Sequence, residues 1–227
     1  MRRYLIAVSA ALAVCVPLAA RAADFTVTWN CYVLDGSLSE GAFDTFGGVI
    51  QIGPDRIFNT TVNFVLPNAF VGNGTGRSIG SIVMVCDVFA DPNGPAIHDI
   101  RVDMLGTIVP GVKARNPYIA WTELVKDISD ANNPRILVSD SGVDYVQPTS
   151  RHYVFDRPTH AIRIKETFVL DGVTYTDENG RTLIDETALA ALTLVEKELS
   201  FVPEPSQIAG LGMALATLTA VLRRRRK

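Results

Sequence analysis

A short glycine-rich segment carries the residue pattern of a serine nucleophile. Gly76-Arg77-Ser78-Ile79-Gly80 matches G-x-S-x-G, in which a strand ends at the serine and a helix follows, so that the hydroxyl group is presented beside an oxyanion hole. Here a glycine-rich loop precedes the serine and a strand pattern follows it, so the context is inverted. His152 and His160 are available as bases, but their positions in the chain establish no triad geometry. We therefore expect no catalysis at Ser78.

A later acidic segment matches part of a calcium-binding loop. Asp177, Asn179, Gly180 and Glu186 fall at positions three, five, six and twelve of the EF-hand loop. Tyr175 occupies position one, where an aspartate is required. We interpret the segment as a polar hairpin tip and keep Asp177, Asn179 and Glu186 as the only candidate metal ligands.

Two carboxylates have a chemistry that depends on their separation in space. Glu123 and Glu166 could form the acid–base pair of a glycosidase, and only the distance between them can decide this. The three histidines have no metal-type spacing: His98, His152 and His160. The sequence therefore predicts a protein without a cofactor and without enzymatic activity.

Aromatic and cysteine side chains share the faces of two predicted strands. Strict alternation groups Phe25, Val27, Trp29, Cys31 and Val33 on one face, and it groups Ile82, Met84, Cys86 and Val88 on another. Both thiols are thus expected in the core, and in an oxidising compartment they predict a Cys31–Cys86 disulfide; two buried free thiols are the alternative. Trp29 is expected in the core with Cys31. Trp29, Trp121 and Tyr118 are the candidates for a sugar-stacking surface. Because Trp29 is expected in the core, only Trp121 remains a candidate.

The N-terminal segment predicts export. Arg2 and Arg3 form a positively charged start, residues 4–18 are largely apolar, and Ala20-Arg21-Ala22 has the small-x-small pattern of a cleavage site. The polar context of a twin-arginine signal does not surround the two arginines. We expect residues 1–22 to be a signal peptide for the general secretory route, removed by signal peptidase.

The C-terminal segment predicts a membrane helix. Residues 207–222 contain no charge, and five cations follow: Arg223, Arg224, Arg225, Arg226 and Lys227. A helix of this length spans ~24 Å, slightly less than the ~30 Å hydrocarbon core, and the flanking arginines can reach the headgroups. Cations beside a span mark its cytoplasmic side, so the preceding residues are expected outside the cytoplasm.

The order of motif, span and basic end resembles the PEP-CTERM sorting signal of Gram-negative bacteria. The residues that carry the resemblance are Val202, Pro203, Glu204, Pro205 and Ser206, followed by the span and its cations. The span is short and lacks the usual tryptophan near its start. The resemblance implies recognition by exosortase, a membrane cysteine transpeptidase, with cleavage near the motif. It also implies an inner-membrane-anchored precursor and a mature form in the envelope or outside the cell.

The body between these ends is acidic and of single-domain size. Residues 24–201 hold 13 Lys and Arg against 23 Asp and Glu. An excess of negative charge disfavours binding to nucleic acid or to an anionic membrane surface. We therefore divide the chain into a signal peptide (1–22), an ectodomain (23–201) and a sorting segment (202–227).

The body reads as an antiparallel β-sandwich. Runs of β-branched and aromatic residues alternate with turn signals such as Asn73-Gly74, Asn93-Gly94, Ser141-Gly142 and Asn179-Gly180. Asp171-Gly172 suits a type I′ hairpin. A short helical turn is expected at 185–190, before a terminal strand at 193–201. The expected strands are 25–34, 48–52, 57–66, 81–89, 99–105, 119–126, 135–139, 161–170 and 173–176.

These features predict an exported, non-enzymatic protein of the cell envelope or extracellular matrix. The expected partners are the secretion translocon, signal peptidase and exosortase, then exopolysaccharide, with membrane contact through the C-terminal helix before processing. A secreted carbohydrate- or calcium-binding module is the first alternative, and a secreted hydrolase is the second.

Overall fold

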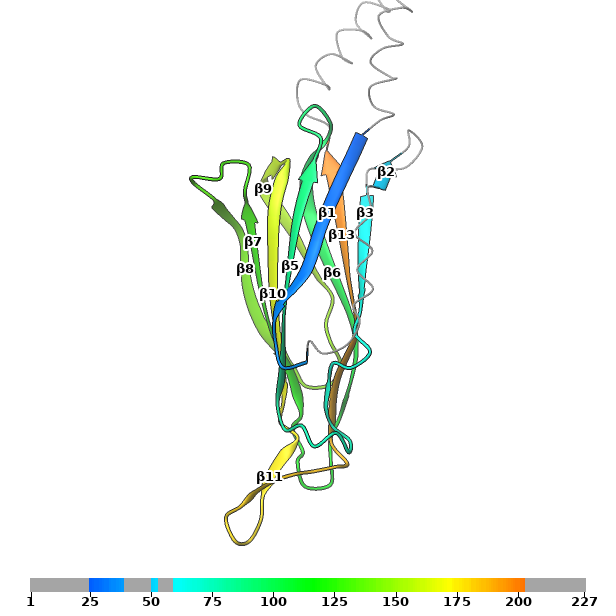
Figure 1. Cartoon of the computed structure of the whole chain (residues 1–227), viewed down its shortest axis with the longest axis vertical. Helices are drawn as coiled ribbons and strands as arrows, with labels where there is room; N and C mark the ends of the chain where they lie inside the picture. The colour runs from blue at the N-terminus through cyan, green and yellow to red at the C-terminus, as the bar shows by residue number, and fades with distance from the viewer. Residues whose placement is uncertain (1–24, 39–49, 53–58, 203–227) are drawn as a thin grey trace, which may run out of the picture.

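The computed structural model describes residues 25–38, 50–52 and 59–202. Within these ranges the secondary structure consists of β-strands joined by turns and loops (Figure 1). The strands are β1 (Phe25–Asp35), β2 (Ile50–Ile52), β3 (Asn59–Val65), β4 (Phe70–Gly72), β5 (Gly80–Ala90), β6 (Ala96–Val109), β7 (Tyr118–Asp127), β8 (Arg135–Asp144), β9 (Arg151–Thr159), β10 (Ala161–Asp171), β11 (Thr174–Thr176), β12 (Thr182–Ile184) and β13 (Leu189–Val202).

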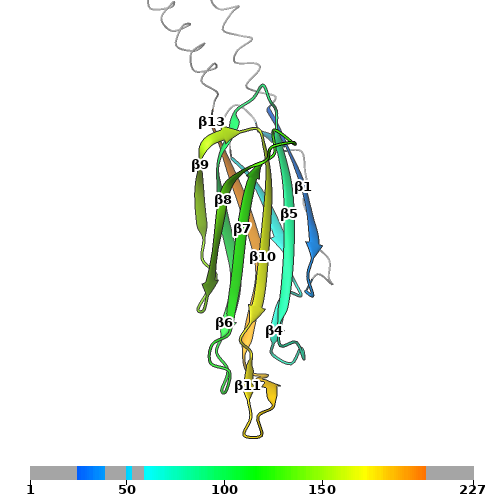
Figure 2. The same ribbon diagram turned by 90° about the vertical axis from the view of Figure 1, so that its left-hand side faces the viewer.

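Two antiparallel sheets face one another, which confirms a mainly β two-sheet sandwich. One sheet has the strand order β2-β1-β5-β10-β7-β8, and the other has the order β3-β13-β6-β9, with β4 also paired to β13. Figures 1 and 2 show the start of β1 and the end of β13 at the same end of the elongated sandwich, and β11 at the opposite end. The two helices expected to flank the body lie outside the described residues.

Alternation along the strands builds the core between the sheets. Ile82, Met84, Cys86 and Val88 of β5 are all nearly inaccessible to solvent, as the sequence pattern predicts. The neighbouring strand β10 sends every second residue into the same layer. Burying one large aliphatic side chain stabilises a fold by about 1.5–3 kcal/mol, so these rows account for much of the cohesion between the sheets.

The strand β9 was not expected from the sequence. Its residues, RHYVFDRPT, are mostly charged or polar, and Pro158 cannot donate a ladder hydrogen bond. The structure places β9 at the edge of its sheet, paired on one side only with β6. An edge position tolerates both features. The short strands β4 and β12 were also not expected.

Two of the expected turns are wrong. Ser141-Gly142 lies inside β8 and pairs with β7, because glycine is needed there for close packing rather than for a turn. Asp171-Gly172 does not join two paired strands, since β10 pairs with β5 and β7 while β11 pairs with β12. Only Gly172 of the two has a positive φ, of 81°, and its Cα passes close to the backbone of Asn116.

The segment before the last strand forms a tight turn instead of a helical turn over 185–190. The amide of Ala188 donates to the carbonyl of Asp185, and β13 begins at Leu189. Strand pairing with β4 and β6 takes the backbone groups of Leu189 and Ala190, so no helix can continue there. The predicted terminal strand is present and is longer than expected. In the part of the chain described, no helix is both long enough and apolar enough to span a membrane.

Candidate functional site

The outer face of the β3-β13-β6-β9 sheet carries a row of polar side chains. Along β6 the inward-facing Val102 is fully buried, so the alternating residues Asp99 and Arg101 face outward. The register places Arg101 between Glu198 of β13 and His152 of β9. Three neighbouring strands thus present charged side chains to the same stretch of surface.

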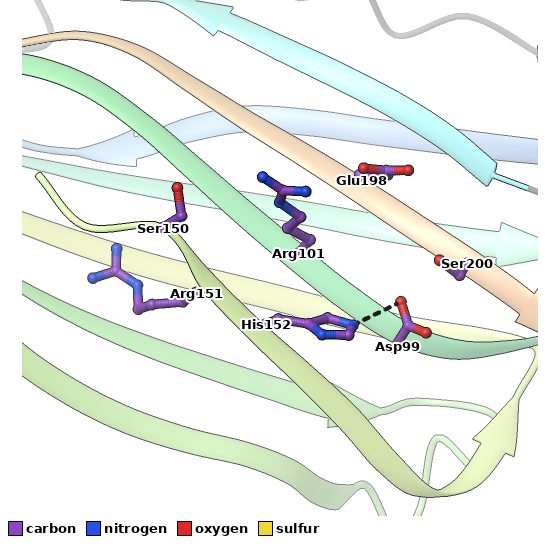
Figure 3. Close-up of a pocket in the computed structure, with 7 residues that line it drawn as sticks. All are labelled: Asp99, Arg101, Ser150, Arg151, His152, Glu198 and Ser200. Atoms are coloured by element: carbon purple, nitrogen blue, oxygen red, sulfur yellow. Dashed lines mark ion pairs between the residues drawn. The ribbon is translucent and has the colours of Figure 1, made fainter.

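These side chains surround a pocket of about 380 Å³ (Figure 3). Nε2 of His152 lies 3.4 Å from Oδ1 of Asp99, and Nδ1 of His98 lies 3.2 Å from Oδ2 of the same carboxylate. Nε of Arg101 lies 2.8 Å from Oδ2 of Asp103, just beyond the pocket. The lining is entirely polar or charged: Asp99, Arg101, Ser150, Arg151, His152, Glu198 and Ser200.

The pocket is suited to hydrogen bonding rather than to bond cleavage. The side chains that face it are those of Arg101, two acidic residues, two serines and His152, because the guanidinium of Arg151 turns inward. Arginine only donates hydrogen bonds, a carboxylate only accepts them, and a hydroxyl does both. Fixed charges of both signs therefore border the pocket, which favours a neutral polar ligand over a multiply charged ion.

Arg151 connects this pocket to the interior of the sandwich. It is the register partner of Val102, so its side chain turns inward while the adjacent His152 stays outside. The guanidinium carbon lies 3.4 Å from the ring centroid of Trp121, and Nη2 lies 2.9 Å from the sulfur of Met104. A cation on an indole face is a favourable arrangement. Burial lowers the pKa of Arg151, which nevertheless stays protonated at neutral pH.

The structure brings Glu123 and Glu166 together. They are direct register partners on β7 and β10, and their side chains are almost completely buried between the sheets. A glycosidase pair must border a cleft that admits both sugar and water. These two carboxyl groups lie in the core and do not line the pocket, so this geometry does not support glycoside hydrolysis.

A lysine from the facing sheet completes the buried cluster. Nζ of Lys197, on β13, contacts the carboxylate of Glu166 and lies 5.5 Å from the ring centroid of Phe64. Burial lowers the pKa of Lys197 to about 7. The negative charge of Glu123 raises this pKa, and the positive charge of Arg151 lowers it further. Burial also raises the pKa of Glu123, which the charges of Lys197 and Arg151 oppose.

Trp121 is not the exposed stacking surface that the sequence left open. It is half-buried, packs against the core and carries the Arg151 guanidinium on its face. Gly142 on β8 makes room for it, because a Cβ there would come within 2.5 Å of the indole ring. Trp29 is in the core as predicted, and its Nε1 donates to Oγ1 of Thr60 at 3.3 Å. The hydroxyl of Tyr118 donates to Asp171 at 3.2 Å.

Two of the three candidate calcium ligands, Asp177 and Glu186, bind other partners. Oδ1 of Asp177 accepts from the amides of Asn179 and Arg181 at 2.9 and 2.8 Å, and its Oδ2 pairs with the guanidinium of Arg181. Oε2 of Glu186 accepts from the amide of Gly74 at 2.6 Å. Asp177 therefore closes the β11–β12 hairpin. Within the described ranges, no three acidic, histidine or cysteine side chains gather as a metal site requires.

The serine motif has the inverted context expected from the sequence. Ser78 lies in the loop between β4 and β5, and strand β5 begins at Gly80, so no helix follows the serine. The two histidines considered as bases lie on or beside β9: His152 contacts Asp99, and Nε2 of His160 lies 3.1 Å from the carbonyl oxygen of Gly94.

Cys31 and Cys86 are joined by a disulfide between adjacent strands. They are direct register partners on β1 and β5, with a Cα–Cα distance of 4.1 Å. Cys86 is fully buried on the core face of β5, whereas Cys31 is partly buried. The bond therefore lies within one sheet.

The targeting segments lie outside the described residues. They are the expected signal peptide with Ala20 and Ala22, the motif residues Pro203 to Ser206, and the basic end at 223–227. Val202, the first residue of the motif, is the last residue of β13, where its backbone pairs with Ala96.

Sequence reasoning missed most of the residues that line the pocket. Arg151 belongs to the unexpected strand β9, and Ser150 directly precedes it.

Lys197 of the buried cluster was also missed, because the sequence pattern assigned it only to a terminal strand. The signal that could have found Lys197 is its place at an inward position, between the apolar residues Val195 and Leu199. A charge at such a position needs a buried partner.

Comparisons with known proteins give only distant structural similarity. No protein-family model and no curated protein matches the sequence. A solved structure of TmCBM61 in complex with β-1,4-galactotriose is similar with a TM-score of 0.29 and 10% identity, over 78% of this chain and 88% of that one. A structure described as CBM4 gives a TM-score of 0.29 and 12% identity, over 78% and 95% of the two chains. The Gap123 complex of Streptococcus agalactiae gives 0.32 and 6%, over 78% and 26%. At these TM-scores the similarity carries no argument about function.

Proposed function

We propose that this chain is an exported, non-enzymatic β-sandwich protein that binds carbohydrate at the pocket on the outer face of β6, β9 and β13. The observation that carries the proposal is that residues of polar or charged type, with fixed charges of both signs, line that pocket. Its volume of about 380 Å³ falls within the range of about 300–1,000 Å³ that is usual for small-molecule sites.

The chemistry of sugar hydroxyls explains why carbohydrate fits this lining best. Each hydroxyl group donates one hydrogen bond and accepts others, so one sugar ring can bond both to Arg101 and to the carboxylates. A free anion would meet Asp99 and Glu198, and a free cation would meet Arg101. Only a neutral polyol, or a sugar with a single charge, satisfies both kinds of group.

We infer from the sequence signals that the protein acts outside the cytoplasm. The signal peptide at 1–22 would direct the chain to the secretion translocon and signal peptidase, and the segment 202–227 would direct it to exosortase. The precursor would be held in the inner membrane by residues 207–222, and the mature protein would meet exopolysaccharide in the envelope or matrix. The pocket lies on the side of the sandwich, formed by strand faces rather than by the loops at either end.

A binding experiment tests the proposal. The mature exported protein is titrated calorimetrically with neutral oligosaccharides of glucose, galactose and mannose and with the exopolysaccharide of the producing cell. Arg101→Ala and His152→Ala each remove a hydrogen-bonding group from the pocket. A hydrogen bond to a charged group contributes about 1.5–3 kcal/mol, so we expect affinity to fall by about tenfold or more.

Lys165→Ala is the matched control for the loss of a cation. It lies on β10, at a solvent-exposed position of the other sheet, and it should bind like the unchanged protein. The proposal is wrong if no glycan binds, or if the control weakens binding as much as Arg101→Ala does.

A further inference from the structure

The contact between Lys197 and Glu166 joins the two sheets in the solvent-inaccessible core. Lys197 is on β13 and Glu166 is on β10, and their side chains are 1% and 2% exposed. Around them lie apolar side chains, including Phe64 on the neighbouring strand β3. Burying an ion pair removes both charges from water, and their mutual attraction often fails to offset this desolvation free energy. This environment favours the uncharged amine and the uncharged acid.

A second carboxyl group stands beside this pair without any partner of its own. Glu123 is the direct register neighbour of Glu166, and neither of its side-chain oxygens has a hydrogen-bond partner among the described residues. The charges of Lys197 and Glu123 influence one another. Burial raises the pKa of Glu123, and a carboxyl group beside the two reacting side chains can give and take protons.

We propose that Lys197 and Glu166 become joined by an isopeptide bond that forms within the folded protein, with Glu123 transferring the protons. The uncharged Nζ attacks the carboxyl carbon Cδ of Glu166, and the Nζ–Cδ bond forms. Glu123 gives a proton to an oxygen of Glu166 and takes one from Nζ. The Cδ–O bond to one hydroxyl group then breaks, and that group leaves as water with a proton from Glu123. As the amide carbonyl forms, Glu123 takes the proton of the remaining hydroxyl group.

The balance of this reaction needs nothing that the chain lacks. One amine and one carboxylic acid give one amide and one water, Glu123 ends protonated as it began, and no atom is oxidised or reduced. Holding two groups in contact inside a folded protein can raise their effective concentration to about 10⁵–10⁸ M. The product replaces two ionisable groups, each costly to bury in its charged form, by one neutral amide.

Peptide mapping of the full, disulfide-reduced chain tests the proposal. Trypsin cuts after Lys165 and Arg181, which frees a peptide of residues 166–181 that begins at Glu166. It cannot cut after a lysine whose amine is acylated. We therefore expect this peptide to remain attached to a second peptide that begins at Thr182 and continues past Lys197. The mass of the linked pair should be lower than the summed masses of its two component peptides by about 18 Da, the mass of one water.

Recovery of the separate peptides 166–181 and 182–197 in full yield from the folded protein would overturn the proposal. Folding is checked by the Cys31–Cys86 disulfide in an unreduced sample and by the circular dichroism of the sheet. Lys197→Met removes the nucleophile and should abolish the linked species.

Glu123→Gln tests the proton transfer while it keeps both bonding partners and the side-chain volume. We expect this variant to fold and to leave residues 166–181 and 182–197 unlinked. Glu196→Gln is the matched control, because it makes the same change on β13 at an outward position, where the register partner is Asp103. In this variant residues 166–181 and the peptide with Lys197 should be linked as in the unchanged chain. A linked Glu123→Gln variant would exclude the role given to Glu123.

Discussion

At the scale of single residues, the carboxylate of Asp185 fastens two distant loops together. Its Oδ2 accepts from the amides of Lys113 and Ala114 at 2.6 and 2.8 Å, and its Oδ1 accepts from the hydroxyl and the amide of Thr187 at 2.6 and 3.0 Å. These donors, led by the Thr187 hydroxyl, hold the pKa of Asp185 well below its ordinary value. The loop after β6 is thereby tied to the turn before β13.

This pKa shift predicts how the stability contributed by Asp185 depends on pH. A lowered folded-state pKa means that the contribution is complete above the unfolded value of about 3.9 and is lost as the pH falls through the folded value. We expect Asp185→Ala to lower the Tm by several degrees at pH 7, and the difference from the unchanged protein to shrink well below pH 4. Thermal unfolding at pH 7 and at progressively lower pH measures this.

Glu178→Ala supplies the control, since it removes the same charge from the exposed tip of the β11–β12 hairpin. Its Tm should match that of the unchanged protein at each pH. A difference for Asp185→Ala that stays constant as the pH falls would contradict the assignment.

Residue-level reasoning from the sequence recovered some members of the site but not their arrangement. Glu123 and Glu166 could be named as a pair of carboxylates, but their adjacency depends on the register between β7 and β10. Gly142 looked like a turn residue because Ser-Gly is a common turn dipeptide. Its real constraint is the indole of Trp121 on the next strand. Local pattern carries no information about such cross-strand contacts.

At the scale of elements, strands with one apolar face were predictable and edge strands were not. β5 and β10 alternate cleanly because one side of each packs on the core. β9 lies at an edge, where most of its side chains remain in solvent, so its sequence lacks that alternation. The pocket depends on β9 for His152, which is why no sequence pattern indicated the pocket.

The Cys31–Cys86 disulfide supports the pairing of β1 with β5. The bond closes a loop with a sequence separation of 55 residues, which in the chain-entropy account stabilises the fold by ~4 kcal/mol. We expect Cys31→Ala/Cys86→Ala to lower the Tm by several degrees, and reductant to have the same effect on the unchanged protein. Differential scanning calorimetry with and without reductant measures both.

The double variant should show no further loss in reductant, because it has no bond to reduce. If the unchanged protein melts at the same temperature with and without reductant, the disulfide makes no contribution to its stability.

At the scale of the whole molecule, the last strand links the body to the expected sorting signal. β13 pairs with β3, β4 and β6, so it is held on both sides almost to its end. Its final residues, Phe201 and Val202, pair with Ile97 and Ala96. Pro203 and Pro205 cannot donate to a sheet ladder, which makes the motif a natural end for this strand.

This arrangement sets the limits of any C-terminal cleavage. A cut before Val202 would remove part of a paired strand and expose Phe201, which is 5% accessible. We therefore expect the mature protein from its native host to lack residues 1–22 and to end near Pro203 to Pro205, as its intact mass will show. Glu204→Ala should leave export intact and prevent this cleavage. A mature chain that still carries residues 223–227 would instead be held by a plain membrane anchor, since processing by exosortase requires their removal.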